Sequence, residues 1–399
     1  MVTAVTNARV FDGEEVIGSP VVTMDGGVIR EIGDTVPPGA TVVDGTGATL
    51  VPGLIDSHVH TDRAGLRDAL AFGVTTELEM QGHWSAKTRR DIAARRDLAD
   101  LRTSGMGVRV KGGHPGQYIE ASGNWLIRLV YPFMPSVNTP DQARRFVARQ
   151  VASGADYVKV FIEDGSTIGY PGLPVIDQPT LLAAVEAAHG FGKLVLAHAT
   201  TAAAARRAVD AGVDGLAHLF LDAPTPGLVE AIARSGVFVI ATLVTLSSAF
   251  GHDAAWLAAD PRVSSKLDQV WLDSLSRSMN VYPQGNLEDS YACLRALREQ
   301  GVDILAGSDV SDPLPMLGGL AHGASLHHEL QLLVRAGFTP SEALRAATCV
   351  PARRFGLTDR GRILPGARAD LLLVAGDPSA DISDTLSVRA VWRGGVRLA

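Results

Sequence analysis

The feature that most constrains the fold of this chain is a regular alternation of short apolar segments with segments of helical periodicity. Eight apolar segments have the length and pattern of buried strands: LIDSHVH (54–60), VTTELEM (74–80), GVRVKGG (107–113), DYVKVFI (156–162), LVLAHAT (194–200), GLAHLF (215–220), VFVIATL (237–243) and VDILAGSD (302–309). Helical segments fill the intervals between them. Near-continuous apolar strands are typical of parallel sheets that helices cover.

Two of the helical segments begin with clear capping signals. The segment 139–154 starts with Thr139 as the cap and Pro140 in the first turn, and the capping box of Thr339 and Glu342 starts another helix. Eight strands, each separated from the next by at least one helix, predict an α/β fold of the closed parallel (β/α)8 type, a TIM barrel. A doubly wound open sheet is the alternative, but no GxGxxG motif follows a strand to support it.

The two ends of the chain have a different pattern. Residues 1–51 and 360–399 contain short strands of alternating polar and apolar residues, separated by turns such as Asp25-Gly26-Gly27. We therefore expect both ends to pair into one small β-sandwich domain, with residues 52–359 as a barrel domain inserted between them. The total of 399 residues fits this division, because a TIM barrel typically needs about 250 residues.

Composition narrows the classes of function. The 36 Lys and Arg residues against 43 Asp and Glu give a net charge of −7, which argues against nucleic acid or an anionic membrane as the main partner. Two cysteines, Cys293 and Cys349, exclude a disulfide scaffold. The least polar stretch, 235–251, is interrupted by Ser, Thr and Gly, and the N-terminus lacks the pattern of a signal peptide. We expect a cytoplasmic protein.

His58 and His60 form an H-x-H pair at the end of the first predicted strand. Residues i and i+2 of a strand point to the same side, so both imidazoles can face one metal ion. The alternative is that two histidines face the mouth of the barrel by chance. Asp56 shares their side of the strand and can orient a ligand through a hydrogen bond.

Lys159 lies inside DYVKVFI, where nearly every neighbour is apolar. A buried lysine is costly unless it is paired, deprotonated or modified. Because burial lowers the pKa of an amine, the neutral amine can add CO2 and become a carbamate, which is an anionic oxygen ligand. The alternative is a lysine whose long side chain reaches a polar partner beyond the apolar segment.

Three more polar residues stand at the ends of predicted strands. His198 ends the fifth strand, His218 ends the sixth, and Asp309 ends the eighth, where an unpaired carboxylate would be costly. Each histidine alone is compatible with a core residue. Together with His58, His60 and Lys159, they all lie at the carboxyl ends of strands, where a closed barrel brings side chains together. The combination predicts a metal site.

Several segments resemble the amidohydrolase superfamily, and more narrowly its imidazolonepropionase-like and prolidase-like branch. In chain order they are VPGLIDSHVH, GVTT, YVKVF, LAHATTAAAARRAVDAGVDGLAHL, LAGSD, HGASLHHELQLLVRAGFTPSEALRAATCVPARRFGL and GRILPGARADLLLV. The resemblance extends from Val51 to the C-terminus. It implies a metal-dependent hydrolase on a TIM barrel.

The resemblance also implies a ligand set with two divalent metal ions. His58, His60 and Asp309 would hold one ion, and His198 and His218 would hold the other, with Lys159, carboxylated by CO2, as the bridge. Imidazolonepropionases resemble mononuclear enzymes without that lysine, so Lys159 places this chain with the binuclear, peptidase-like members. The histidine-rich set favours zinc, with manganese, cobalt and iron as alternatives.

The mechanism follows from such a site. A water bridging two cations has its pKa lowered from about 16 towards about 7, so hydroxide is available at neutral pH. We expect Asp309 to act as general base and then general acid. His114, in KGGHPGQ, matches a histidine of the same branch and can bind the carbonyl or the oxyanion, unless it only structures its loop. Tyr131 and His322 are further candidates for substrate binding.

The predicted reaction is hydrolysis of an amide bond in a small molecule, such as a dipeptide or an N-acyl amino acid. Lactone, carbamate or cyclic-amide hydrolysis at the same centre, ring deamination, and a non-catalytic scaffold are the alternatives. Three long connections, 112–138, 163–178 and 244–285, should select the substrate. The family suggests a carboxylate on the substrate, for which Arg128, Arg262 and Arg277 are candidates. Because many relatives resemble homo-oligomers, this chain could also form a homo-oligomer.

Overall fold

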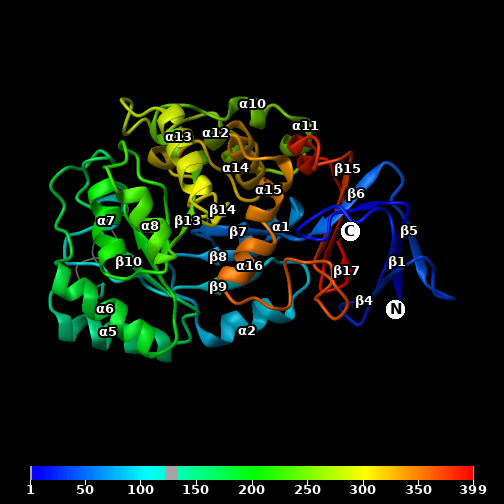
Figure 1. Ribbon diagram of the computed structural model, residues 1–399, viewed down its shortest axis with the longest axis horizontal. Coiled ribbons are helices and arrows are strands. Elements are labelled where there is room, and N and C mark those ends of the chain that lie inside the picture. The colour runs from blue at the N-terminus through cyan, green and yellow to red at the C-terminus, as the bar shows by residue number, and fades with distance from the viewer. Residues whose placement is uncertain (1, 122–133, 399) are drawn as a thin grey trace.

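The computed structural model describes residues 2–121 and 134–398, and parallel strands flanked by helices form its centre (Figure 1). One sheet contains β7 (Leu54–Val59), β8 (Val74–Glu79) and β9 (Asp100–Thr103). The other contains β10 (Val158–Phe161), β11 (Val195–His198), β12 (Gly215–Leu216), β13 (Phe238–Ile240) and β14 (Ile304–Leu305). All neighbouring strands in both sheets are parallel, which confirms the predicted α/β class.

Hydrogen bonds beyond the strand ends join the two sheets at both edges. On one edge, the His60 amide donates to the Val310 carbonyl at 2.7 Å, and the Asp309 amide donates to the His58 carbonyl at 2.7 Å. On the other edge, the Asp156 amide donates to the Thr103 carbonyl at 2.8 Å. The ends of β7 and β14 are therefore fixed next to each other.

The prediction for the third strand was wrong. The strand in this place is β9, and within 107–113 only Val108 makes an isolated parallel bridge, to Val160. The β9 segment, DLRT, carries Asp100 and Arg102, so its sequence lacks the apolar pattern of a buried strand. Ion pairs provided by distant segments compensate for the charges, and sequence periodicity does not register such pairs.

The helices follow the strands as predicted, and two predicted caps are confirmed. Thr139 accepts from the backbone at the start of α5, and Thr339 with Glu342 forms a complete capping box at the start of α15. The helices are α1 (Arg63–Ala71), α2 (Ala86–Ala94), α3 (Gly116–Ala121), α5 (Pro140–Ala152), α6 (Gln178–Gly190), α7 (Ala202–Asp210), α8 (Leu228–Ser235), α9 (Leu243–Ala249), α10 (Ala255–Ala258), α11 (Pro261–Ser264), α12 (Gln269–Leu275), α13 (Leu287–Glu299), α14 (Ala324–Arg335), α15 (Pro340–Ala346) and α16 (Cys349–Arg354), with short 3-10 turns η2 (Pro315–Leu317) and η3 (Ile382–Leu386). None of the helices in the described residues has the length and apolar character needed to cross a bilayer.

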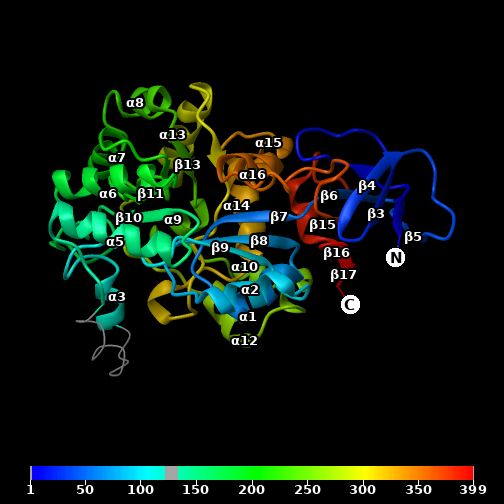
Figure 2. The same ribbon diagram turned by 90° about the horizontal axis from the view of Figure 1, so that it is seen from below.

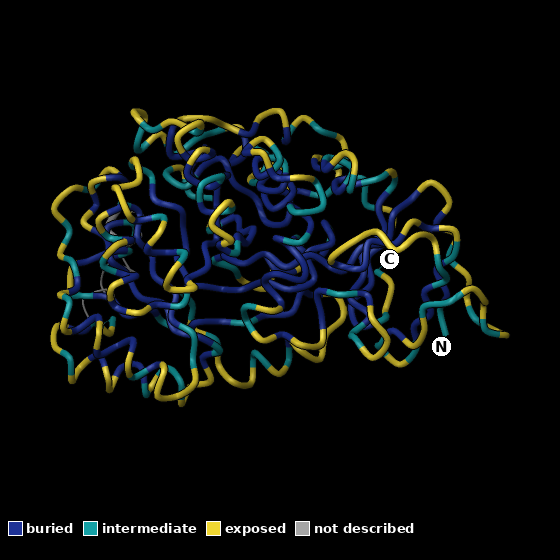
Figure 3. Tube along the Cα trace, in the orientation of Figure 1, coloured by how far each residue is buried: buried dark blue, intermediate teal, exposed yellow. Residues whose placement is uncertain are grey.

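Alternate residues of the central strands pack into two different apolar clusters. Ile55 and Leu196 belong to a cluster formed by the strands themselves with the α16 region, whereas their neighbours Leu54 and Val195 pack with the surrounding helices. The strands are consequently buried on both faces, as the dark blue centre of Figure 3 shows. Burial on both faces explains why most of these strands appear in the sequence as continuous apolar runs.

The two ends of the chain form two sheets at one end of the molecule, opposite α5 to α8 (Figures 1 and 2). One sheet has the order β4 (Val28–Gly33), β3 (Val21–Asp25), β1 (Thr3–Thr6), β5 (Thr41–Asp44). The other has the order β17 (Val396–Arg397), β16 (Val388–Arg393), β15 (Leu371–Ala375), β6 (Ala48–Pro52), β2 (Arg9–Val10). In the second sheet, β15 from the C-terminal end pairs antiparallel with β6 from the N-terminal end.

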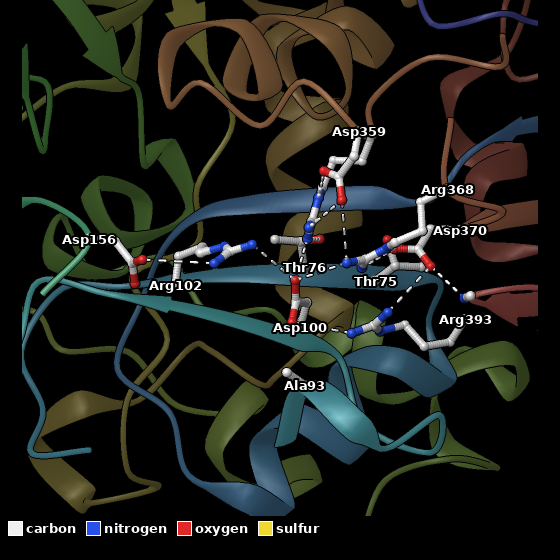
Figure 4. A network of polar contacts seen from close by, with 12 residues as sticks. Thr75, Thr76, Ala93, Asp100, Arg102, Asp156, Asp359, Arg368, Asp370 and Arg393 are labelled. Carbon is white, nitrogen blue, oxygen red and sulfur yellow. Dashed lines mark hydrogen bonds and ion pairs between the residues drawn. The ribbon is translucent and has the colours of Figure 1, made fainter. Parts of the chain in front are cut away.

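A buried ion-pair network connects the terminal sheets to the amino end of β9 (Figure 4). The Asp100 carboxylate lies 2.5 Å from Arg360, 3.1 Å from Arg368 and 3.2 Å from Arg393. Burial would raise the pKa of Asp100, but the three guanidinium groups outweigh it and hold that pKa well below its usual range. Because β16 supplies Arg393, this one carboxylate ties the second terminal sheet to the central strands.

We expect Asp100→Asn to lower the free energy of unfolding by about 3–5 kcal/mol, because the neutral amide removes the anion that two buried guanidinium groups, of Arg360 and Arg393, and one partly buried group, of Arg368, share. Thermal melting and guanidinium denaturation would measure the loss. Asp141→Asn is the matched control, because the Asp141 side chain on α5 is 77% exposed and forms an ion pair with Arg144 one turn along the same helix. Equal stability of the two variants would contradict the structural role of the network.

Candidate active site

A cavity of about 410 Å³ opens at the carboxyl ends of the central strands. Polar side chains that follow or end different strands line its base: His60, His114, Lys159, His198, His218 and Asp309. His58 lies directly beneath and is fully buried. The structure thus brings together every residue predicted from the sequence as a metal ligand.

His58, His60 and Asp309 form the tightest group in the cavity. Asp309 Oδ1 lies 3.1 Å from His58 Nε2 and 3.3 Å from His60 Nε2. One ligand atom from each of the three residues lies within 4.8 Å of the others, so these residues could hold a metal ion. Asp309 has a left-handed backbone, with φ +52°, which is unfavourable for a residue with a Cβ. The hydrogen bond from the Asp309 amide to the His58 carbonyl holds Asp309 in this conformation.

The hydrogen bonds of His58 define which nitrogen faces the cavity. His58 Nδ1 lies 2.8 Å from the Ala217 carbonyl, and since a carbonyl only accepts, Nδ1 carries the proton. Burial, reinforced by the nearby Lys159 ammonium, lowers the pKa of His58 to about 4. His58 is therefore a neutral imidazole whose Nε2 lone pair points at Asp309, which is the form a metal ion requires.

His198 and His218 lie next to this group. The His218 ring centroid is 4.5 Å from that of His58 and 4.8 Å from that of His198, and His218 Nδ1 is 3.8 Å from Asp309 Oδ2. His218 Nδ1 also lies 3.2 Å from the hydroxyl of Thr242, a buried residue with φ +46°. The two histidines that the sequence assigned to neighbouring strands are thus in contact.

Lys159 completes the base of the cavity. Its Nζ lies 3.5 Å from His58 Nε2, and only 1% of the residue is exposed. Burial lowers the pKa of the Lys159 amine to about 7, so a large fraction of it is neutral at physiological pH. The side chain does not reach a polar partner at the surface, which was the alternative interpretation.

Glu163 was not predicted, although it directly contacts a predicted site residue. Its Oε2 accepts from His198 Nε2 at 2.9 Å, and the Thr200 hydroxyl donates to the same oxygen. His198 Nε2 therefore carries a proton, and Nδ1 keeps the lone pair. The signal in the sequence was a carboxylate four residues after Lys159, just beyond the same strand.

His114 stacks on His198, with ring centroids 4.3 Å apart and planes at 19°. The Gln117 amide nitrogen lies 2.7 Å from His114 Nδ1, so Nδ1 accepts and Nε2 carries the proton. Burial, followed by the influence of His198, lowers the pKa of His114 well below its ordinary value. A neutral His114 offers an N–H donor at the cavity wall, although it follows Val108 in a loop rather than ending a strand.

The remaining predicted residues lie elsewhere. Asp56 accepts from the Ser308 amide at 2.9 Å and from the Ser308 hydroxyl at 2.6 Å, so it fixes the backbone before Asp309 rather than an imidazole. His322 is outside the cavity lining and lies 3.5 Å from Glu77. Tyr131 and Arg128 fall outside the described residues.

The sequence profile of the Amidohydrolase family matches residues 49–398. The chain belongs to the amidohydrolase family. An uncharacterised protein of Mycobacterium tuberculosis is 29% identical over 350 residues, covering 85% of this chain and 81% of the relative. The imidazolonepropionase of Rhodococcus jostii is 25% identical over 435 residues, covering 98% of this chain and 92% of the enzyme.

Solved structures share the whole fold. The structure of a prolidase complexed with N-methylphosphonate-L-proline superposes with a TM-score of 0.76 at 23% identity, covering 100% of this chain and 99% of the prolidase. The chain accordingly has a TIM-barrel-like α/β fold. It belongs to the imidazolonepropionase-like and prolidase-like branch that was predicted from the sequence. Members of the amidohydrolase family usually bind metal ions, and the chain is a metal-dependent hydrolase.

Burial of Lys159 in the site lowers the free energy of unfolding, and this loss can be measured on the metal-free protein. The folded pKa of Lys159 is about 7, against 10.5 for an ordinary lysine, so the unfolded chain binds more protons between pH 7 and 10.5. The stability of the metal-free protein should therefore rise with pH through this window. We expect Lys159→Met to be more stable than the parent at pH 6.5 by on the order of 3–5 kcal/mol, and this advantage should vanish near pH 10.

Denaturation of both proteins in CO2-free buffer with a chelator would measure the difference. Lys87→Met is the control, because the Lys87 side chain is 83% exposed and its removal should give no such pH dependence. A Lys159→Met variant that is less stable than the parent at pH 6.5 would show that the ammonium group is well solvated or paired.

Proposed function

We propose that the protein is a binuclear metal-dependent hydrolase that cleaves an amide bond in a small molecule. The observation that carries this proposal is the convergence of His58, His60 and Asp309 on one point, with both imidazole nitrogens 3.1–3.3 Å from the same carboxylate oxygen. Three neutral or anionic ligand atoms at that spacing match the requirements of a divalent ion such as zinc.

In this proposal, His198 and His218 would hold a second ion, and two histidines alone do not complete the ligand set of a divalent ion.

 Lys159, once carboxylated, would supply a further ligand. The Lys159 nitrogen lone pair adds to CO2 and the nitrogen loses a proton, which gives a carbamate with two ligand oxygens. The pKa of about 7 supports this step, because only the neutral amine has a free lone pair.

Different residues of the chain would have different roles in amide hydrolysis. When bound, the two divalent ions would activate a water molecule and polarise the scissile carbonyl. Asp309 is positioned to take a proton from the attacking water and to deliver it to the leaving nitrogen. His114 is positioned to donate from Nε2 to the carbonyl oxygen as negative charge develops there. Water is consumed, and a carboxylic acid and an amine are released.

The prolidase among the similar structures supports an amide as the scissile bond, because its bound ligand is an analogue built on proline. The same centre would also accept a lactone or a carbamate, since both present a carbonyl to the same groups. A screen of dipeptides, N-acyl amino acids, N-acyl amines, carbamates and lactones would identify the preferred bond.

We also propose a division into domains. Residues 52–359 would form a closed (β/α)8 barrel, supported by the hydrogen bonds that join β7 to the end of β14 and β9 to the start of β10. Residues 1–51 and 360–399 would form a small β-sandwich domain, supported by the pairing of β6 with β15 and by a separate apolar cluster that includes Leu50 and Leu371.

Glu163 should act as a positioning residue for the metal centre. Glu163→Gln removes the anionic acceptor that orients His198, so we expect metal affinity to fall by about 10–100-fold. Metal content after dialysis against a competing chelator would measure the change. Glu186→Gln is the control, because the Glu186 side chain is 69% exposed. Equal retention in the two variants would contradict the role of Glu163.

Asp309→Asn tests the proposed reaction directly. We expect kcat to fall by about 10²–10⁴-fold with an unchanged circular dichroism spectrum, because the amide cannot carry the proton. Chelation should abolish activity, and the divalent metal should restore it. Asp141→Asn, remote from the cavity on α5, should keep the parent kcat. Hydrolysis that survives chelation, or an Asp309→Asn variant with the parent kcat, would refute the mechanism.

A further inference from the structure

Six apolar side chains form part of the cavity lining, which we call the wall. α9 supplies Leu246, the chain between α12 and α13 supplies Met279 and Val281, and the segment around η2 supplies Leu314, Leu317 and Leu320. Leu246 and Leu320 are buried, whereas the other four side chains are partly exposed at the cavity. An apolar group in the cavity would remove these partly exposed side chains from water, which favours binding.

Outside the proposed metal ligands, the charged side chains of the cavity are unfavourable for an anionic substrate. Among the described residues, the lining contains no arginine, and its single lysine, Lys159, is one of those ligands. Apart from the ligand Asp309, two carboxyl groups line the same cavity, those of the exposed Asp62 and Asp312. In the described part of the lining, a substrate carboxylate would lose hydration without meeting a guanidinium group.

Two of the three arginines expected to bind a substrate carboxylate, Arg262 and Arg277, are not in this wall, and the third, Arg128, falls outside the described residues. Arg262 pairs with Asp260 at 2.6 Å and donates to the Ser387 hydroxyl at 3.0 Å, so its guanidinium is engaged elsewhere. Arg277 also lies outside the cavity lining.

We infer that the substrate is an uncharged N-acyl amine with an apolar group, rather than a dipeptide or an N-acyl amino acid with a free carboxylate. The inference rests on the proposed amide hydrolysis and names the class of amide that the cavity accepts. It replaces the expectation of a carboxylate-bearing substrate, which came from the family and not from the residues of this cavity.

Two probes that differ only in a carboxylate would test the inference on the metal-loaded enzyme. N-phenylacetyl-leucine carries the carboxylate, and N-phenylacetyl-isopentylamine is the same amide without it. We expect kcat/KM for the uncharged probe to be about 10-fold higher or more, because an unpaired charge disfavours binding in the cavity. Inhibition of the faster reaction by the slower probe on the metal-loaded parent enzyme would give the same order of affinity even where turnover of the slower probe is slow.

The outcomes separate this inference from the proposed function. Equal or better hydrolysis or binding of N-phenylacetyl-leucine would overturn the inference and leave amide hydrolysis intact. Failure of the protein to bind metal, or to hydrolyse any amide in the screen, would instead overturn the proposed function. Tighter binding of the uncharged probe supports the inference.

A gain-of-function variant tests the charge argument independently. Met279→Arg places a guanidinium in the wall with a side chain of similar length, and Met279→Gln is the neutral polar control. We expect Met279→Arg to shift the ratio of kcat/KM values towards N-phenylacetyl-leucine by about 10-fold, and Met279→Gln to change the ratio by less than about 3-fold. Equal shifts in the two variants would show that charge does not determine the preference.

Discussion

The parallel hydrogen-bonded pairing of the central strands is the constraint on which the site depends. In a parallel sheet all carboxyl ends lie on the same edge, so residues more than two hundred positions apart become neighbours. The register between β10 and β11 places Phe161 beside His198, and the bond from the Asp309 amide to the His58 carbonyl joins the last strand to the first. No local interaction could bring these side chains together.

Charged side chains have opposite effects on stability at the two ends of the central strands. At the amino end, Asp100 is surrounded by three guanidinium groups, and the charges compensate one another (Figure 4). At the carboxyl end, the Lys159 amine is buried beside the neutral imidazole of His58, and burial lowers the pKa of this amine to about 7. A stabilising network and a destabilising site therefore share one set of strands. This is the arrangement expected when function requires side chains that stability alone would not retain.

Much of the site could be predicted from the sequence because its residues interrupt apolar strands at their ends. His198, His218 and Asp309 each stand where a core strand has no need for a polar side chain, and the structure brings all three to one cavity. The third strand was missed for the converse reason. Asp100 and Arg102 look like surface residues until their partners from distant segments are known. Glu163 was missed because its partner, His198, lies on another strand.

Most of the wall of the cavity could not be predicted in the same way, because irregular segments and a short 3-10 turn supply all of it except Leu246 on α9. Met279 and Leu317 belong to segments without a repeating pattern, so nothing in the sequence indicates which of their side chains face the cavity. The family resemblance determines the base of the site, where the chemistry is shared, and it led to the expectation of a carboxylate on the substrate. The apolar side chains of the wall and the nearby carboxylates Asp62 and Asp312 support the inference about the substrate without any reference to the family. Chemistry and specificity are thus encoded in different parts of the sequence, the strand ends and the connections that follow them.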